Sequence, residues 1–175
     1  MRVQSRNKFY RGARNSFLML WLAVSVLTLH SLGNQATASS SQFIAKDHIV
    51  IDLRSGVEWL RCSVGQQWSG TNCIGEIVKL NHKMVKQAIA QANEQIGGSW
   101  RLPSRAELEG LVCEDCPRPK IESVIFPQTP SEPFWSGEQN KWSPKHYWSV
   151  NFFTGHTYGR FLPFQDLAVR LVRDR

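Results

Sequence analysis

Apolar and polar residues follow two different periods along the chain, which predicts both strands and helices. Short apolar runs at residues 49–53 and 57–60 flank Arg54-Ser55-Gly56, and this pattern is typical of a β-hairpin. Three further strand candidates follow in the second half of the chain, at residues 134–136, 147–152 and 167–173. The predicted helices lie together between the early and late strands, and this order favours an α+β domain over a Rossmann-like array.

A long helix is predicted after Asn81, which is a good N-cap residue. The apolar residues that follow recur at helical spacing and form one stripe: Met84, Val85, Ala88, Ile89, Ala92 and Ile96. Gly97 and Gly98 supply the left-handed backbone that commonly ends a helix. The opposite face of this helix is polar, and we expect solvent to cover it.

A second helix start is marked by Ser104-Arg-Ala-Glu107, which has the form of a capping box. In a capping box, the serine hydroxyl and the glutamate carboxylate each accept a hydrogen bond from a backbone amide. The side chains expected to be buried are Leu108, Leu111 and Val112, and the prolines expected to end the helix are Pro117 and Pro119. We expect Arg101 either to satisfy loop carbonyls or to pair with an acid such as Glu107.

The first 38 residues have the three parts of a secretory signal peptide. Five basic and no acidic residues precede residue 17, thirteen uncharged residues follow at 17–29, and Ala36-Thr37-Ala38 is an A-x-A cleavage signal. The alternative is an uncleaved anchor, but thirteen residues span only about 20 Å as a helix, whereas the hydrocarbon core is about 30 Å thick. We therefore predict a signal peptide at residues 1–38 and no stable membrane anchor after its cleavage. Residues 39–175 form one predicted domain, located in the periplasm or secreted.

The net charge depends on whether this leader is kept. The whole chain carries +7, from 21 Lys+Arg against 14 Asp+Glu. The leader holds five of the basic residues and none of the acidic ones, so residues 39–175 carry 16 against 14, a net charge of +2. Such a domain lacks the basic excess of most nucleic-acid-binding proteins, and we expect no nucleic acid partner.

All four cysteines, Cys62, Cys73, Cys113 and Cys116, lie in the predicted exported part. An even number in an oxidising compartment indicates two disulfides, but three pairings are possible and the sequence alone does not choose between them. We prefer the local pairing, Cys62–Cys73 with Cys113–Cys116. A redox site is disfavoured because the two acidic residues between Cys113 and Cys116 would destabilise a thiolate. A zinc site is disfavoured because Cys62 and Cys73 stand eleven residues apart.

A set of short motifs occurs in the order found in one protein family. The set comprises Val57-Glu-Trp59, Arg61-Cys62-Ser-Val-Gly65, Trp68, Cys73-Ile-Gly75, Trp100-Arg-Leu-Pro103, Glu107-Leu108, Phe126-Pro-Gln-Thr-Pro130, Phe134-Trp-Ser136 and Val169-Arg-Leu-Val-Arg173. Through these motifs the chain, from about residue 49 to 173, resembles the C-terminal domain family of the Legionella collagen-like protein. The resemblance implies a compact C-type lectin-like domain, with two helices packed on short twisted antiparallel strands, long loops and disulfide staples. Because the named family member is an adhesin domain that binds sulfated polysaccharides, it also implies a binding module.

No catalytic motif of the G-x-S-x-G, H-E-x-x-H or P-loop type occurs in the chain. The segments most similar to the calcium-binding motifs of C-type lectins are Glu132-Pro133-Phe134 and residues 148–151. Calcium needs six or more oxygen ligands, but Phe134 supplies no carboxamide oxygen and no Asp follows Asn151. We therefore expect neither an enzyme nor a bound cofactor or metal, and we interpret Pro133 as the start of a strand.

The segment 126–164 contains 11 aromatic residues among 39. Part of this set is expected in the core, namely Phe126, Trp135, Trp148 and Phe152. The candidate ligand-binding residues, all expected on loops, are Lys141, Trp142, Lys145, His146, Tyr158 and Arg160. Aromatic faces stack on sugar rings or on a partner loop, while Lys and Arg pair with sulfate or carboxylate.

Two functions fit these expectations. The first is an exported, non-catalytic binding module whose partner is an anionic polysaccharide or a cell-envelope glycan. The alternative is a periplasmic protein-binding module, such as a toxin inhibitor or an immunity protein, whose partner is another exported protein. A small, disulfide-stapled domain without a catalytic signature suits either role.

Overall fold

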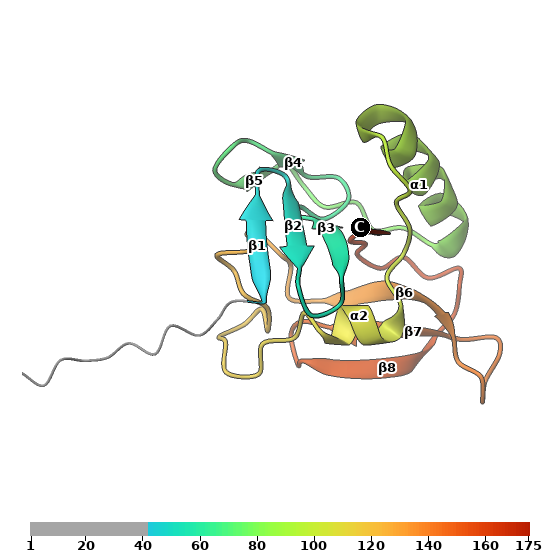
Figure 1. Cartoon of the computed structure of the whole chain (residues 1–175). Coiled ribbons are helices and arrows are strands. Elements are labelled where there is room, and N and C mark those ends of the chain that lie inside the picture. The colour runs from blue at the N-terminus through green and yellow to red at the C-terminus, as the bar shows by residue number, and fades with distance from the viewer. Residues whose placement is uncertain (1–41) are drawn as a thin grey trace, which may run out of the picture. The chain divides into compact units, whose positions relative to one another are not determined.

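The computed structural model describes residues 42–175, so the predicted signal peptide at residues 1–38 lies outside the described residues. The strands are β1 (Phe43–Lys46), β2 (Ile49–Asp52), β3 (Val57–Leu60), β4 (Gln67–Trp68), β5 (Cys73–Ile74), β6 (Pro133–Gln139), β7 (Tyr147–Asn151), β8 (His156–Phe161) and β9 (Val172–Asp174). The helices are α1 (His82–Ile96) and α2 (Arg105–Glu109). The described chain is a mixed α and β fold with few helices, as the order of predicted elements indicated (Figure 1).

The strands of the described chain form three antiparallel sheets. The four-stranded sheet has the order β1-β2-β3-β9, the three-stranded sheet has the order β6-β7-β8, and β4 pairs with β5. The predicted hairpin is confirmed, because β2 pairs with β3 and Ile51 lies opposite Glu58. Since β9 pairs with β3, the C-terminal strand belongs to the same sheet as the first described strands (Figure 1).

The C-terminal segment connects the two larger sheets. Isolated β-bridges join it to three places: Leu80 with Leu167, Phe134 with Ala168, and Arg101 with Val172. The predicted strand at residues 167–173 is wrong in extent, because only Val172–Asp174 is a strand. The residues before Val172 meet a different neighbour at each step, so they cannot continue one ladder with a single partner strand.

Two hydrophobic clusters share the β6-β7-β8 sheet. Successive side chains of a strand point to opposite faces, so Phe134 and Trp135 of β6 enter different clusters. Phe134 packs in the cluster that contains Trp59 and Leu108, whereas Trp135 packs in the one that contains Val85 of α1. Both Phe134 and Trp135 are fully buried, which confirms the core position predicted for Trp135. This sheet therefore holds the two clusters together.

Both helices begin where the sequence predicted. The Asn81 side chain accepts a hydrogen bond from the amide of Met84 at 3.1 Å, and Gly97 at φ +68° follows the end of α1. The capping box at the start of α2 is present, but α2 ends at Glu109, before the point predicted. Leu111 and Val112 donate to carbonyls three residues back, and such tightened turns commonly finish a helix.

The sequence pattern missed four strands. In β1 only Phe43 is buried and the next three residues are exposed, so the strand carries no alternating pattern. The expected loop at residues 65–75 contains β4 and β5, which have two residues each. β8 was expected to be a loop, and it is a strand of six residues. Each of them pairs with a neighbouring strand in the antiparallel sheets.

The preferred disulfide pairing is confirmed. Cys62 is bonded to Cys73 and Cys113 to Cys116, with Cα–Cα distances of 5.5 Å and 5.3 Å. The first disulfide closes the segment from Cys62 to Cys73, which contains β4 and ends at the first residue of β5. The second closes a short turn after α2. Such bonds persist in oxidising compartments.

Removing the Cys62–Cys73 disulfide is expected to lower the free energy of unfolding by about 3 kcal/mol, because an open loop of this length regains chain entropy. Removing Cys113–Cys116, which closes a shorter loop, is expected to cost about 2 kcal/mol. Guanidinium unfolding of the two double Cys→Ala variants measures both losses. A larger loss for the Cys113–Cys116 variant would contradict this ranking.

His82, the first residue of α1, packs between two aromatic rings. Its ring centroid lies 3.8 Å from that of Tyr147 and 4.6 Å from that of Trp135. Burial lowers the pKa of His82 below its ordinary value of 6.5, and the positive charge of Lys86 lowers it further. The folded chain therefore binds a proton at this ring less readily than the unfolded chain does.

We expect the free energy of unfolding to decrease as the pH falls through the interval below about 6.5, because protonation of His82 favours the unfolded chain. His82→Phe keeps an aromatic ring but cannot titrate, so this part of the pH dependence should disappear. Urea unfolding at about pH 7 and at about pH 5 compares the variant with the natural chain. Equal pH dependence of the variant and the natural chain would show that His82 does not contribute. The matched control is His156→Phe, at an exposed histidine, which should keep the pH dependence of the natural chain.

Candidate functional site

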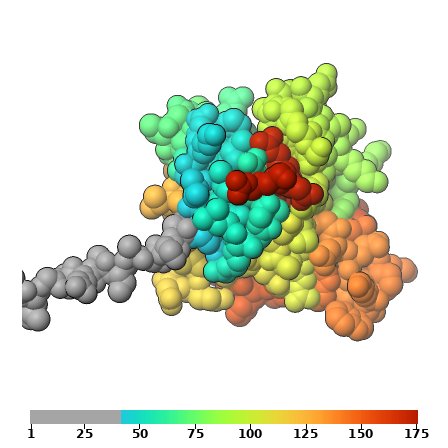
Figure 2. Space-filling model, in the orientation of Figure 1, coloured from blue at the N-terminus to red at the C-terminus, as the bar shows by residue number. Residues whose placement is uncertain are grey.

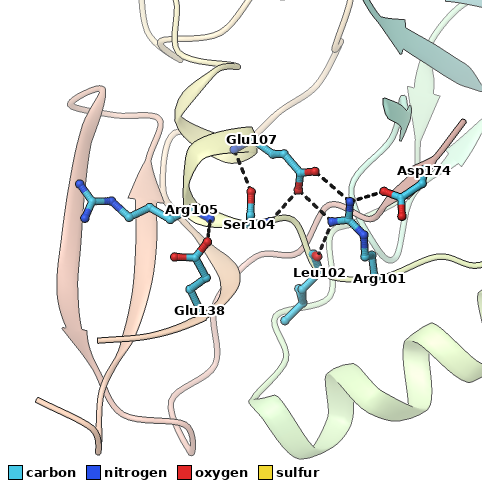
Figure 3. Close-up of polar contacts among 7 residues, drawn as sticks. All are labelled: Arg101, Leu102, Ser104, Arg105, Glu107, Glu138 and Asp174. Atoms are coloured by element: carbon cyan, nitrogen blue, oxygen red, sulfur yellow. Dashed lines mark hydrogen bonds and ion pairs between the residues drawn. The ribbon is translucent and has the colours of Figure 1, made fainter. Parts of the chain in front are cut away.

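The residues that precede α2 determine how this helix is held. Two nitrogens of the Arg101 guanidinium donate to the two carboxylate oxygens of Glu107, each at 2.8 Å, and Arg101 also donates to Asp174 of β9 (Figure 3). The predicted pairing of Arg101 with Glu107 is confirmed. The hydrogen bond from Arg101 lowers the pKa of Glu107, and Glu107 in turn raises the pKa of Arg101. Both groups stay charged, so α2 is tied to the C-terminal strand.

Two side chains satisfy the first amides of α2. The Ser104 hydroxyl accepts a hydrogen bond from the Glu107 amide at 3.1 Å, and the Glu107 carboxylate accepts one from the Ser104 amide at 2.7 Å. The Arg105 amide donates to the carboxylate of Glu138 in β6 at 3.1 Å (Figure 3). Because first-turn amides have no partner inside the helix, the Glu138 carboxylate anchors α2 to the β6-β7-β8 sheet.

The Arg105 side chain lies over an aromatic pair. Its guanidinium carbon is 4.2 Å from the ring centroid of Trp148 in β7, and the ring of Trp142 meets Trp148 edge-on at 6.4 Å. The Arg105 Nε donates to Glu109 at 2.7 Å, which fixes the guanidinium in this position. A Cβ at Gly159 would lie 2.6 Å from the Trp148 ring, so only glycine leaves room for the indole there. We call Arg105, Trp142 and Trp148 the stacked cluster.

The loop between β6 and β7, residues 140–146, carries Trp142 at its turn. The Asn140 side chain donates to the Gly159 carbonyl at 2.8 Å and accepts from the Trp142 amide at 3.0 Å. The Ser143 hydroxyl lies 2.7 Å from His146 Nδ1. Although these contacts hold the loop, 84% of Trp142 is exposed. The surrounding hairpin forms a corner of the surface, drawn in orange in Figure 2.

Four of the six predicted ligand-binding residues lie on this loop as expected: Lys141, Trp142, Lys145 and His146. The other two, Tyr158 and Arg160, were expected on a loop, and that prediction is wrong because both belong to β8. The register between β7 and β8 shifts between Tyr147 and Ser149, and such a bulge interrupts the alternation by which a strand is recognised.

Tyr158 and Arg160 form a separate pair beside the loop. The Arg160 guanidinium carbon lies 4.9 Å from the Tyr158 ring centroid, and the Tyr158 hydroxyl is 3.3 Å from the Thr154 hydroxyl. Tyr158 is the register partner of Ser149. Since neighbouring side chains of a strand alternate in direction, its side chain leaves the sheet on the face opposite to Trp148. Gly159 connects the pair to the loop through its hydrogen bond with Asn140.

The segment that forms the β6-β7-β8 sheet carries a small excess of positive charge. From residue 133 to residue 165 the charged residues are Lys141, Lys145 and Arg160 against Glu138, a net charge of +2. This equals the net charge of residues 39–175 as a whole, so the remaining basic and acidic residues balance. Lys141, Lys145 and Arg160 are all exposed. We call these three cations, with Trp142, the hairpin patch. Lys141, Trp142 and Lys145 lie on the loop, whereas Arg160 lies on β8 against Tyr158.

Sequence reasoning missed the role of two residues in this site. Trp148 was expected in the core, but it is half-buried and its ring is shared between Arg105 and Trp142. It projects to the same face as Val150, which is fully buried, so the sequence pattern alone does not distinguish the two positions. No sequence signal indicated Arg105, because its partner in the stack lies in a distant strand.

The described part of the chain contains no group of three or more His, Cys, Asp or Glu residues arranged to hold a metal ion. Pro133 begins β6, which agrees with its interpretation as the start of a strand. Within residues 42–175, neither helix has the length and apolar character needed to cross a bilayer.

Comparison with known proteins gives one family. The family model described as the Lcl C-terminal domain matches residues 48–173. No curated protein and no solved structure matches the chain.

Proposed function

The chain belongs to the Lcl C-terminal domain family, and on this premise we propose that it is an exported, non-catalytic binding module for an anionic polysaccharide or a cell-envelope glycan. The observation that carries the proposal is the hairpin patch, where the exposed cations accompany a tryptophan that is 84% exposed. An indole face that is open to solvent is available to stack on a sugar ring, and the exposed cations are available to pair with sulfate or carboxylate. The ligand class is the one that the family resemblance led us to expect.

In the proposed complex, Trp142 stacks on the apolar face of a sugar ring. Lys141, Lys145 and Arg160 pair with sulfate or carboxylate groups along the polysaccharide. Each exposed ion pair contributes about 1 kcal/mol or less, so several must act together on a repeating ligand. The edge-on contact of Trp148 with the Trp142 ring restricts that ring, which reduces the entropy lost when it binds.

We also propose that the domain has a C-type lectin-like fold and that it lies in the periplasm or outside the cell. A C-type lectin-like fold is supported by the two helices, the antiparallel sheets and the two disulfides. A location in the periplasm or outside the cell is supported by the same disulfides, because bonds of this kind form and persist in oxidising compartments. Glycans of the cell envelope and extracellular polysaccharides are accessible from either place.

Binding to immobilised polysaccharides tests the proposal directly. The protein purified after export is applied at low salt to heparin, to dextran sulfate and to unsulfated dextran. We expect it to bind the two sulfated polymers and not the neutral one, because the ion pairs of the hairpin patch need anionic groups. If no sulfated or acidic glycan binds, the proposal is wrong.

The alternative, a protein-binding module such as a toxin inhibitor or an immunity protein, stays a prediction. No contact among the described residues favours it over a glycan ligand. Co-purification with the product of a neighbouring gene for an exported toxin would support it instead.

A further inference from the structure

A groove of about 650 Å³ lies between α1 and the segment that the Cys62–Cys73 disulfide closes. This volume is in the range of small-molecule binding sites. Leu60 and Leu171 contribute apolar surface to it, and Ala88 and Ala92 border it from α1. Because alanine side chains are small, the helix leaves space where a larger residue would fill the groove. In Figure 1 these walls are α1 and the β4–β5 segment at the top of the view.

Unpaired carboxamides line both walls of the groove. Gln91 and Gln95 belong to α1, and Gln67 belongs to β4. All three are exposed and make no side-chain hydrogen bond within the described part of the chain. Gln91 and Gln95 are four residues apart, so they lie on the same face of the helix. A carboxamide both donates and accepts hydrogen bonds, as a sugar hydroxyl does.

One end of the groove is aromatic. The Arg61 guanidinium carbon lies 4.0 Å from the Trp68 ring centroid. Arg61 also donates to the carbonyls of Ile125 at 2.9 Å and Val124 at 3.0 Å, so it backs the ring from a fixed position. Asp47 and His48, whose side chains are paired at 3.2 Å, border the same end. A rigid indole beside hydrogen-bonding groups is suited to one face of a sugar ring.

The charge of the groove separates it from the hairpin patch. No Lys or Arg occurs among the described residues that line it, and Asp47 is the one carboxylate there. Arg61, beside the groove, is stacked on Trp68 and donates to backbone carbonyls, so it is already engaged and an anionic polysaccharide gains little from this site. We propose that the groove is a second ligand site, distinct from the hairpin patch, and that it binds a short uncharged oligosaccharide.

A peptide is a less suitable occupant than a saccharide. Extended peptides commonly bind by adding a strand to an exposed sheet edge. The strand that borders the groove, β4, has two residues and is already paired with β5. The groove is instead bordered by side-chain amides on both walls and by the Trp68 indole, which a saccharide can contact without strand pairing.

The test is a titration of the protein with the uncharged trisaccharides cellotriose and chitotriose, followed through the NMR signal of the Trp68 indole. A Trp68→Phe variant assigns this signal. We expect at least one trisaccharide to shift it saturably. In the double variant Gln91→Ala/Gln95→Ala, binding of that trisaccharide should weaken about tenfold, since two hydrogen bonds are lost. Alanine favours helix, so α1 is preserved.

Gln87→Ala is the matched control, because Gln87 is an exposed glutamine of α1 that does not line the groove. We expect this variant to bind the trisaccharide like the natural chain. The proposal is overturned if neither trisaccharide shifts the Trp68 signal, if only peptides do so, or if the double variant binds as well as the control. Heparin binding is measured on the same proteins, and its loss or retention reports on the hairpin patch alone.

Discussion

Replacing Arg170 by alanine is expected to lower the free energy of unfolding by about 4 kcal/mol, through unsatisfied polar groups and a cavity. Arg170 is fully buried. Its guanidinium donates to the carbonyls of Leu60 and Arg61, to the Ser63 hydroxyl at 3.2 Å and to the Thr129 hydroxyl at 2.7 Å. One side chain therefore joins the end of β3 to the loop before β6, and alanine leaves these acceptors without their donor.

The environment of Arg170 is unusual because no carboxylate pairs with it among the described residues. Burial lowers the pKa of Arg170 to about 9, which leaves the group charged at neutral pH. The rings of Phe126 and Phe134 have their centroids 4.9 Å and 6.0 Å from its guanidinium carbon. Their attraction for the cation offsets part of the free energy lost when the charge is removed from water. The carbonyl and hydroxyl acceptors supply the rest, so the arrangement depends on all of them together.

Guanidinium unfolding of Arg170→Ala measures the loss. Arg170→Lys gives a second measurement if the alanine variant does not fold, because lysine keeps the charge but lacks the planar fork that reaches acceptors on several segments. We expect the lysine variant to lose about 2 kcal/mol. Arg175→Ala, at an exposed arginine, should have no measurable effect. A loss below about 1 kcal/mol for Arg170→Ala would contradict this account of the core.

Replacing Gly65 by alanine is expected to cost about 3 to 4 kcal/mol, from a left-handed backbone and from a steric collision. Gly65 has φ +97°, and a Cβ placed on it would lie 2.5 Å from the Glu76 carbonyl oxygen and from the Val78 amide nitrogen. The Val78 amide donates to the carbonyl of Val64 at 2.9 Å. The Glu76 oxygen and the Val78 nitrogen both belong to the backbone, so they cannot move aside as the end of a flexible side chain could.

Gly56→Ala is the matched control for this prediction. Gly56 also has positive φ, at +69°, but no atom lies within 4 Å of its added Cβ. It should therefore lose only the cost of the left-handed backbone, about 1 kcal/mol. Thermal and guanidinium unfolding compare the two variants. Equal losses at Gly65 and Gly56 would show that the close approach of the backbones has no energetic consequence.

Local signals in the sequence predicted local structure well. The hairpin turn at residues 54–56, the Asn81 cap of α1, the Ser104 capping box and the local disulfide pairing each depend on residues close together in the chain. The contact between Arg101 and Glu107 belongs to the same class, because both residues adjoin the capping box. In each case the partners are separated by only a few residues or by one loop.

Contacts between distant segments were not predictable in the same way. The partners of Arg170 are up to 110 residues away along the chain. β8 lacks regular alternation because its register with β7 shifts, and α2 ends early because its last turn tightens. The stacked cluster joins Arg105 to Trp148, which is 43 residues later by sequence number. The groove forms between α1 and the β4–β5 segment, which the sequence pattern did not place side by side. Gln91, on the helix face that we expected only solvent to cover, therefore lines the groove.

The central claim is that the hairpin patch binds an anionic polysaccharide, and the affinity for heparin of a triple variant tests it most directly. Lys141→Ala, Lys145→Ala and Arg160→Ala are combined in one protein, and its dissociation constant is measured beside that of the natural chain at low and at physiological salt. We predict that the natural chain binds heparin, that salt weakens this binding, and that the triple variant binds at least about tenfold more weakly at low salt. The matched control replaces three exposed cations elsewhere, Lys46, Lys83 and Lys86, with alanine and should bind nearly as well as the natural chain. Equal affinity of the natural chain and the triple variant would contradict the claim.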